Sequence, residues 1–537
     1  MKKFYLFIFY SIIFLNINSK TTKDIEVDVS EKFSVESING STWRKVQKKA
    51  KDTVIQLYVE NSEFNWLEPY KSPDQTRSSG SGFFIDSDGY LVSNFHVVDQ
   101  AINVKIQIPS FGKRRLDAEV VGVNPDRDLS LLKLTDESVT KVKKKLGEIP
   151  FLKFGNSDKV LRTQEVMAMG YPLGQEKLKT TQGIVSGRER VWGESYIQIT
   201  APLNPGNSGG PCLNNKGEVI GINTAKYPKS ENVGYIIPIN DLKSVIKDLR
   251  KIKFLRKPIL GCEFNYGNDE MVKFLKNPEP GGLYISRVYP KTLFEKVGVK
   301  EGDMLYEING KKIDVYGETS VPWSEDKVSI LDLLNRFIVD QDINVIIYRK
   351  GEKKEFNFKF ELLDELPIRK FYPPYEKVDY EIIGGMVVMD LALNHVSALL
   401  ETDPYLVGYK KRENRYDPYL LITHVFPDSQ TREARTLGVS DIITHVNGEP
   451  TKTLEEFRKH VLKSKKDGFL TVKSKDQKFM VLSLEKILKE EDNLVSNFLF
   501  KPSKLIKELG GVMKKEIKPE KTKSDKTKKR KVTVVAA

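Results

Sequence analysis

The sequence predicts a mainly β protein, in which an all-β barrel or sandwich precedes two smaller modules that resemble each other. Short apolar runs separated by glycine, proline and asparagine turns fill residues 52–239, as in a barrel or sandwich. A pattern of strand, proline, short helix and a strand ending in Asn-Gly then occurs twice, which is an internal repeat. The length of 537 residues leaves room for three to four domains of roughly 150 residues each.

The composition is that of a globular chain. Hydrophobic residues make up 39% and charged residues 30%, which excludes a wholly disordered, collagenous or polytopic membrane protein. The formal net charge is +14, but half of this excess lies between Lys514 and Lys531, where ten Lys or Arg face three Asp or Glu. The rest is only mildly basic, which argues against a nucleic-acid-binding core. Cys212 and Cys262 allow at most one disulfide. No CxxC or HExxH motif occurs, so we expect neither a metal nor a cofactor.

The two ends of the chain are predicted to lie outside the folded domains. Basic Lys2-Lys3 precedes an apolar run from Phe4 to about Ile17, and polar residues close it; this is typical of a signal peptide at 1–19. The run is short for a membrane span of roughly 20 residues, although an uncleaved anchor is the alternative. We therefore expect an exported protein, in a periplasm or cell envelope or secreted. The Lys-rich tail predicts a solvated disordered segment or, alternatively, contact with an anionic surface.

The expected elements follow from local patterns. Six apolar runs have strand length: Val54–Val59, Gly82–Ile85, Tyr90–Ser93, Val104–Ile108, Leu129–Leu134 and Val166–Met169. Asp241–Lys251 has apolar residues at helical spacing and is expected to end the first domain. Helical runs in the two modules are predicted at Ile330–Val339 and Leu454–Lys463. The expected units are a linker at 20–45, the β domain at 46–252, the first module at 258–362, a linker at 363–378, the second module at 379–487 and an extension at 488–537.

The strongest signal for chemistry is the segment Asn204-Pro205-Gly206-Asn207-Ser208-Gly209-Gly210-Pro211. A serine hydroxyl attacks only when a base takes its proton and backbone N–H groups stabilise the oxyanion. Glycines around Ser208 let the chain turn tightly and direct the amides of Gly206 and Ser208 to one point. The similar Gly155-Asn156-Ser157-Asp158 lacks the following Gly-Gly, and Asp158 would repel an oxyanion, so we interpret Ser157 as a turn residue.

A base and a carboxylate are also available in this domain. His96 is the only histidine before Asn394 and follows a predicted strand; an isolated histidine is usually structural, but the serine motif favours the base. The third group must be a carboxylate that orients the imidazole. Asp128 abuts the apolar strand at Leu129 and is well placed for burial, whereas Asp126 lies in a turn and is expected to be solvated. We therefore predict Asp128.

The order His96, Asp128, Ser208 on an all-β domain resembles chymotrypsin-clan serine proteases, and the motifs resemble the HtrA/Deg family more closely, nearest its plant-type branch with two unlike PDZ domains. The motifs are Gly80–Ile85, Asn94–Val98, Asp128–Lys133, Gly170–Gly174, Gly183–Gly187, Gly206–Pro211 and Gly221–Ala225. The resemblance runs from about Val54 to Ile487. One departure is Phe95, which replaces the small residue common before the catalytic histidine in this family.

The resemblance implies a chymotrypsin-like double β-barrel protease domain followed by two PDZ-like α/β modules. It implies an ATP-independent serine endopeptidase for unfolded or damaged proteins, with His96 as general base, Asp128 as its orienting carboxylate and Ser208 as nucleophile. The amides of Gly206, Asn207 and Ser208 would form the oxyanion hole. The residues implied for the S1 pocket are Leu203, Ile222, Asn223 and Thr224, and we expect small or medium aliphatic residues at P1. The implied carboxylate-binding loop of the first module is Leu260, Gly261 and Cys262, with Gly384–Val387 as a weaker counterpart in the second.

The expected partners are unfolded protein substrates, peptide C-termini and further copies of this chain, in a trimer or a multiple of trimers. No specific nucleic acid is expected. Exposed rings are costly in a monomer, so Phe64, Trp66 and Tyr70 are predicted at the subunit interface, with a loop folded back on its own barrel as the alternative. The competing functional hypothesis is a holdase chaperone or scaffold on a protease fold. The combination of His96, Asp128 and the complete glycine loop favours the enzyme.

Overall fold

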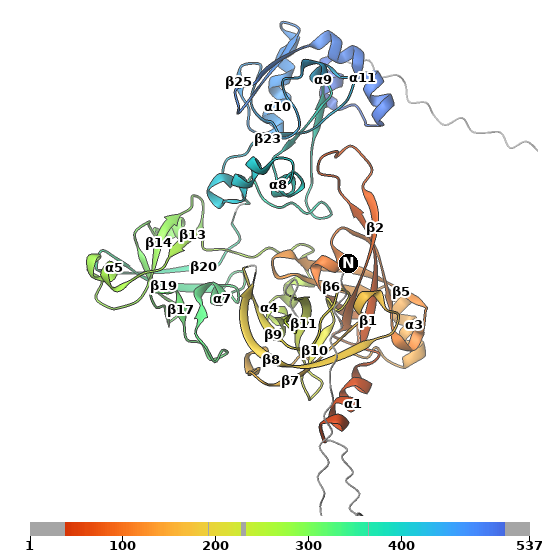
Figure 1. The fold of residues 1–537 in the computed structure, drawn as a ribbon, viewed down its shortest axis with the longest axis vertical. Coiled ribbons are helices and arrows are strands. Elements are labelled where there is room, and N and C mark those ends of the chain that lie inside the picture. The colour runs from red at the N-terminus through yellow and green to blue at the C-terminus, as the bar shows by residue number, and fades with distance from the viewer. Residues whose placement is uncertain (1–37, 192, 227–231, 364, 511–537) are drawn as a thin grey trace, which may run out of the picture.

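A computed structural model describes residues 38–191, 193–226, 232–363 and 365–510 of the chain. The predicted signal peptide and the Lys-rich tail lie outside these residues. Within the described part, no helix has the length and apolar character needed to cross a membrane. The chain forms a double-barrel domain and two separate modules, and the second module lies above the long hairpin of the first barrel in the view of Figure 1.

Two closed barrels of six antiparallel strands form the double-barrel domain. The first contains, in spatial order, β1 (Val54–Glu63), β2 (Asp74–Phe84), β3 (Tyr90–Ser93), β6 (Leu129–Leu134), β5 (Arg115–Asn124) and β4 (Ala101–Gln107). The second contains β10 (Pro211–Leu213), β11 (Val219–Lys226), β12 (Gly234–Pro238), β9 (Glu194–Ile199), β8 (Lys179–Val191) and β7 (Glu165–Gly170). The mainly β class and the barrel architecture are confirmed. In each barrel the first and last strands of the spatial order pair with each other, so the sheet closes without an open edge.

Among the described residues, four α-helices accompany the two barrels of this domain. They are α1 (Ile38–Ala50), α2 (Phe95–Val98), α3 (Asp136–Leu146) and α4 (Ile239–Leu249). Helix α4 agrees with the helix predicted at Asp241–Lys251, but it begins and ends two residues earlier. It buries Leu242, Val245 and Leu249. Helix α1 packs Trp43 into the same core, and the indole N–H donates to the Glu165 carboxylate at 3.2 Å. The predicted domain start at 46 falls inside α1.

Most elements of the two modules follow the same order, as expected of an internal repeat, although each module also has strands that the other lacks. The first runs β13 (Cys262–Asn265), α5 (Asp269–Phe274), β14 (Leu283–Val288), α6 (Leu293–Val297), β15 (Met304–Ile308), β16 (Lys311–Lys312), β17 (Glu318–Thr319), β18 (Val328–Ser329), α7 (Ile330–Leu334), β19 (Asp342–Arg349) and β20 (Glu352–Lys359). The second runs β21 (Glu381–Ile383), β22 (Met386–Asp390), α8 (Leu393–Ala398), β23 (Leu420–Val425), α9 (Gln430–Ala434), β24 (Ile442–Val446), β25 (Glu449–Pro450), α10 (Leu454–Val461), β26 (Phe469–Ser474) and β27 (Phe479–Ser483). Helix α7 ends earlier than the predicted Ile330–Val339.

Two further helices cover the second module. Helix α11 (Leu484–Phe498) runs through the predicted boundary at 487, and α12 (Lys504–Leu509) follows it. Leu494 of α11 and the following Phe500 pack on Val387 and Phe426 of the sheet. The Phe426 ring stacks on that of Phe500 with 5.4 Å between ring centroids. The apolar face next to Gly384–Val387 is therefore covered by the chain's own C-terminal segment.

The tip of the β1–β2 hairpin contacts the second module. The Trp66 ring meets the His395 ring edge-on at 5.2 Å, and Tyr70 lies 4.9 Å from Phe426. Burial lowers the pKa of His395 to about 3, so its ring is neutral and its Nδ1 accepts the N–H of Ala392. The sequence placed these aromatic residues at a subunit interface or on their own barrel. In this structure Trp66 and Tyr70 instead pack against the second module of the same chain, and Phe64 packs on Trp66.

We expect Trp66→Ala to weaken this docking. The substitution removes a half-buried ring and its edge-to-face contact with His395, which is worth about 1–3 kcal/mol. Protease digestion should then separate the second module from the barrels faster, while the barrels stay folded. Tyr405→Ala is the control, because that ring is 64% exposed on the same module. Equal digestion of wild type and Trp66→Ala would show that the hairpin tip does not anchor the module.

Candidate active site

The predicted base and carboxylate lie side by side at the rim of the first barrel. His96 Nδ1 is 2.9 Å from Asp128 Oδ2, and the His96 backbone N–H donates to Asp128 Oδ1 at 2.9 Å. The His96 side chain is 50% exposed and that of Asp128 is 23% exposed. Burial of the ring lowers the pKa of His96, but the hydrogen bond and charge of Asp128, with the charge of Asp99, outweigh it and raise the pKa above its ordinary value. This arrangement stabilises the imidazolium that forms when the ring accepts a proton.

A tight turn positions Asp128. Pro125–Arg127 form one turn of 3-10 helix, and the Asn124 side chain accepts the N–H of Arg127 at 3.1 Å. Asp128 follows in the left-handed region with φ 52°, and its carbonyl accepts the N–H of Phe95 at 3.2 Å. Asp126, the rejected alternative, accepts the backbone N–H of Lys257 at 2.9 Å instead. The turn therefore directs Asp128, and not Asp126, to the imidazole.

The glycine-rich segment around Ser208 lies between the two barrels. Gly206 has φ +98°, and a Cβ there would collide with the carbonyl of Tyr171, so only glycine fits. Ser81 fixes the segment from the first barrel: its hydroxyl donates to Gly206 O at 2.6 Å, and its N–H donates to Ser208 O at 2.8 Å. Ser81 belongs to the Gly-Ser-Gly motif of the sequence, but nothing in the sequence assigned it this bracing role.

Thr224 contacts both ends of the proposed triad. The Ser208 hydroxyl donates to Thr224 O at 2.9 Å, and the Thr224 hydroxyl donates to Asp128 Oδ2 at 2.8 Å. Within the described residues, no hydrogen bond joins Ser208 Oγ to the ring of His96. The three predicted residues are thus brought to one place, but the serine hydroxyl must rotate away from Thr224 O to meet the base. Catalytic hydrogen bonds often form fully only when substrate binds.

The three backbone amides predicted to form the oxyanion hole differ in whether they are already hydrogen-bonded. The N–H of Asn207 donates to Asn204 O at 2.9 Å, so this amide is engaged in a turn and is not available to an oxyanion in this conformation. Among the described residues, the N–H groups of Gly206 and Ser208 donate to no acceptor. These two amides are the pair left to receive a developing negative charge.

The residues predicted to line the S1 pocket are mostly in the core. Ile222 and Asn223 are fully buried, and the Asn223 amide donates to Met169 O at 3.1 Å. Their side chains brace the second barrel and do not face an open pocket. Leu203 is also buried and packs among apolar residues of that barrel. Thr224 alone contacts the triad. The sequence missed this because the side-chain direction on β11 depends on a bulge between Asn223 and Ala225.

The predicted carboxylate-binding loop lies on a cleft of about 860 Å³. Gly261 has φ +86°, and a Cβ there would collide with the Thr292 side chain. Leu260, Gly261 and Cys262 line one wall, and Leu331 and Leu334 of α7 line another. The cleft also has walls from the double-barrel domain, from residues 365–372 and from the second module, so it lies where the first module meets the rest of the chain. In the second module, by contrast, Met386 and Val387 are fully buried.

Known families match the double-barrel domain and the second module. A family described as trypsin-like peptidase domain matches residues 80–222, and a family described as PDZ domain matches residues 373–502. The fold and site thus define a trypsin-like peptidase that carries a PDZ domain.

Similar proteins narrow the class. A protein of Marinomonas sp. (strain MWYL1) named probable periplasmic serine endoprotease DegP-like is 30% identical over 452 residues, which cover 80% of this chain and 87% of the relative. A protein of Hahella chejuensis with the same name is 26% identical and covers 84% of this chain and 92% of the relative. The periplasmic serine endoprotease DegP of Escherichia coli K12 is 35% identical over 44% of this chain and 49% of its own length. A solved HtrA-type protease, AlgW with tripeptide, aligns with 60% of this chain and 98% of its own at 25% identity and a TM-score of 0.47.

The chain belongs to the DegP-like, HtrA-type family of serine endoproteases. It is a serine protease of that type, with a trypsin-like domain and a PDZ domain. The plant-type branch within the family stays a prediction.

Proposed function

We propose that this protein is an exported serine endopeptidase that degrades unfolded or damaged proteins without ATP, with His96, Asp128 and Ser208 as its catalytic triad. The observation that carries the proposal is the convergence of these side chains, from segments as far as 112 residues apart in sequence, at the junction of two closed barrels. The pairing of His96 Nδ1 with Asp128 at 2.9 Å fixes the imidazole so that Nε2 faces outward as the base.

The proposed reaction uses only groups of this chain. Ser208 Oγ leaves the carbonyl of Thr224, gives its proton to His96 and attacks the scissile carbonyl. The amides of Gly206 and Ser208 stabilise the oxyanion, and His96 then protonates the leaving amine. Water attacks the resulting acyl-serine in the second half, with His96 again as base. Thr224 remains the proposed contact with the P1 residue, for which we propose a preference for small or medium aliphatic side chains.

Export and assembly are part of the proposal. The basic, apolar and polar order of residues 1–20 supports export, and the relatives are named as periplasmic proteins. We propose a homo-oligomer, a trimer or a multiple of trimers, from the resemblance to HtrA proteases. Because Trp66 and Tyr70 pack against the second module in this structure, and Phe64 packs on Trp66, these rings no longer argue for that interface. Light scattering of the full chain measures its mass directly, and a monomer at micromolar concentration contradicts this part.

Degradation of an unfolded protein in the absence of ATP tests the function. The wild type is expected to convert a reduced, unfolded protein into peptides and to cleave its folded form far more slowly, because an extended segment must enter the site. Ser208→Ala is the control for contaminating protease. A holdase or scaffold, the competing function, suppresses aggregation equally in wild type and Ser208→Ala and produces no peptides.

The first PDZ-like module is proposed to bind peptide C-termini in the 860 Å³ cleft. We expect Leu331→Lys to weaken binding of a labelled peptide with a C-terminal valine at least tenfold, because the side chain lines the cleft and is 37% exposed. Phe274→Lys is the matched control, since Phe274 is 83% exposed and lies outside the cleft. Fluorescence anisotropy gives both dissociation constants. Equal affinities in the two variants would place the peptide elsewhere.

A further inference from the structure

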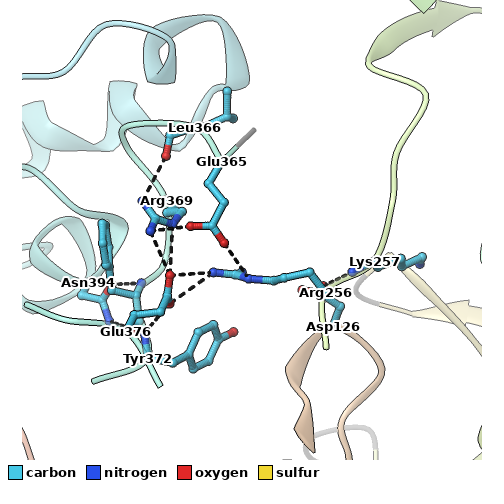
Figure 2. A network of polar contacts seen from close by, with 10 residues as sticks. Asp126, Arg256, Lys257, Glu365, Leu366, Arg369, Tyr372, Glu376 and Asn394 are labelled. Carbon is cyan, nitrogen blue, oxygen red and sulfur yellow. Dashed lines mark hydrogen bonds and ion pairs between the residues drawn. The ribbon is translucent and has the colours of Figure 1, made fainter. Parts of the chain in front are cut away.

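A strap of residues 365–376 connects the two modules and is held to the double-barrel domain by charge. The guanidinium of Arg256 pairs with Glu376 and with Glu365, each at 3.2 Å. Arg369 of the strap also pairs with Glu376 at 2.9 Å, so two arginines share this carboxylate (Figure 2). Arg256 directly follows residues 253–255, which bond to Val123 of β5. The strap is therefore tied to the barrel wall.

The same strap is tied to the second module on its other side. The Asn394 side chain of α8 accepts the N–H of Phe371 at 2.8 Å and donates to Phe371 O at 3.1 Å. The N–H of Leu393 donates to Arg369 O at 2.9 Å, and Ile368 is fully buried in the core cluster of that module. Figure 2 shows Asn394 and Tyr372 on either side of the strap. A movement of the second module relative to the barrels must therefore displace the strap.

Between these two anchors the strap inserts Tyr372 into the first barrel. The Tyr372 side chain is 7% exposed and belongs to the core cluster of that barrel. Its ring lies edge-on to the ring of Phe95 at 5.5 Å and 5.4 Å from the ring of Phe254. Its N–H donates to Glu376 at 2.9 Å. Tyr375 stacks on Phe254 at 5.2 Å between ring centroids.

Phe95 is the residue directly before His96. Helix α2 is a single turn, and its N-cap Asn94 makes no capping hydrogen bond. Its position depends on hydrogen bonds to Asp128, from the N–H groups of Phe95 and His96, and on the packing of Phe95, Val97 and Val98, which are buried. The packing of the Phe95 ring is thus one of the contacts that set the backbone carrying the imidazole. Phe95 is also the residue at which the sequence departs from the family pattern.

We propose that Tyr372 is a positioning residue for His96: its ring, held between the second module and the barrel by the strap, packs on Phe95 and fixes the helix turn that carries the base. This inference rests on the proposed catalytic role of His96. It gives the second module a route to the active site that needs no contact with substrate. It also gives a role to the large ring before the histidine, since a small residue there would leave the Tyr372 ring with Phe254 but without its contact to this helix turn.

Full-length Tyr372→Ala, Tyr372→Phe and Tyr375→Ala test this with a small chromogenic peptide. A misplaced base lowers the rate of the chemical step and leaves ground-state binding intact. We expect Tyr372→Ala to lower kcat by roughly ten- to a hundredfold with KM within about twofold. Tyr372→Phe keeps the ring and should stay within about twofold of wild type, because the hydroxyl has no described hydrogen bond. Tyr375→Ala removes a similar ring whose described ring contact is with Phe254, and kcat should fall less than about threefold. Unchanged kcat in Tyr372→Ala, or an equal loss in Tyr375→Ala, overturns the proposal.

A double-mutant comparison tests the route through Phe95. In a Phe95→Leu background, Tyr372→Ala should cost less than about threefold in kcat, because the ring contact is already gone. An equal fold-loss in both backgrounds overturns the route. Should Tyr372→Ala prove unfolded by circular dichroism, Asn394→Ala serves instead, because it loosens the strap without touching the barrel. A folded Asn394→Ala with unchanged kcat contradicts the coupling to the second module.

Reaction of Ser208 with diisopropyl fluorophosphate separates this inference from the function on which it rests. The base must take the serine proton as the O–P bond forms and fluoride leaves. The second-order rate should fall in Tyr372→Ala by the same factor as kcat. If wild-type Ser208 does not react at all, the proposed catalytic roles fail. If wild type and Tyr372→Ala react equally fast, only the positioning role of Tyr372 fails.

Discussion

Ser208→Ala is expected to lower kcat/KM on a small peptide substrate by roughly 10⁴–10⁶-fold, with the fold unchanged. The substitution removes one hydroxyl, whose described hydrogen bond is the one to Thr224 O. Loss of that bond is a small structural change, because a backbone carbonyl can be solvated instead. The catalytic loss is large because the proposed attack on the scissile carbonyl needs this hydroxyl beside both the base and the amides of Gly206 and Ser208. Steady-state kinetics and circular dichroism on the same preparations measure the two effects.

Ser157→Ala is the matched control for this prediction. Ser157 also follows Gly-Asn, but it begins a 3-10 turn and its hydroxyl accepts the N–H of Asn240 at 3.1 Å. We expect about 1 kcal/mol of lost stability from the missing bond and activity within about threefold of wild type. An active Ser208→Ala, or an inactive but folded Ser157→Ala, would show that the wrong serine was chosen.

The sequence was sufficient for the parts of the molecule that local pattern determines. Strands β3 and β6 coincide with predicted apolar runs because nearly all of their side chains, on both faces of the strand, are buried. Asp128 was chosen over Asp126 because it abuts such a strand, and the structure puts its carboxylate on His96. The repeat of the two modules also followed from local motifs, since each module closes its own core.

The sequence was insufficient where side chains far apart in the chain meet. Ser81 bonds to Gly206, 125 residues away, and no period or motif reports such a contact. The direction of Asn223 on β11 depends on a bulge, so a residue predicted to face substrate is instead buried. The sequence indicated that the apolar rings of Phe64, Trp66 and Tyr70 need a partner. It did not indicate which surface covers them. The hydrophobic effect is non-directional, so an apolar ring in the sequence indicates that some surface must cover it but not which one.

Asp128→Asn is expected to reduce kcat by roughly 10⁴-fold, whereas Asp126→Asn should cost only a few-fold. The introduced side-chain amide would keep the shape of the carboxylate but lose its charge, and one of its two ends would present donors to His96 Nδ1. The imidazole would then favour the wrong tautomer, and the imidazolium formed during attack would lose its counter-charge. Asp126 contacts Lys257 N–H and not the imidazole, so its charge is not required for the chemistry.

The pH dependence of kcat/KM distinguishes Asp128 from Asp126 as the carboxylate that orients His96. The base must be neutral to accept a proton, so kcat/KM rises with pH through the pKa of His96 in the free enzyme. Burial of the ring lowers this pKa, but Asp128 and, more weakly, Asp99 raise it above the ordinary value near 6.5. Removing the Asp128 charge takes away the main raising effect, so the acid limb of Asp128→Asn should move to lower pH even as the plateau falls. Asp126→Asn should leave the limb where wild type has it. A larger loss in Asp126→Asn, or an unmoved limb in Asp128→Asn, would mean that another carboxylate orients the base.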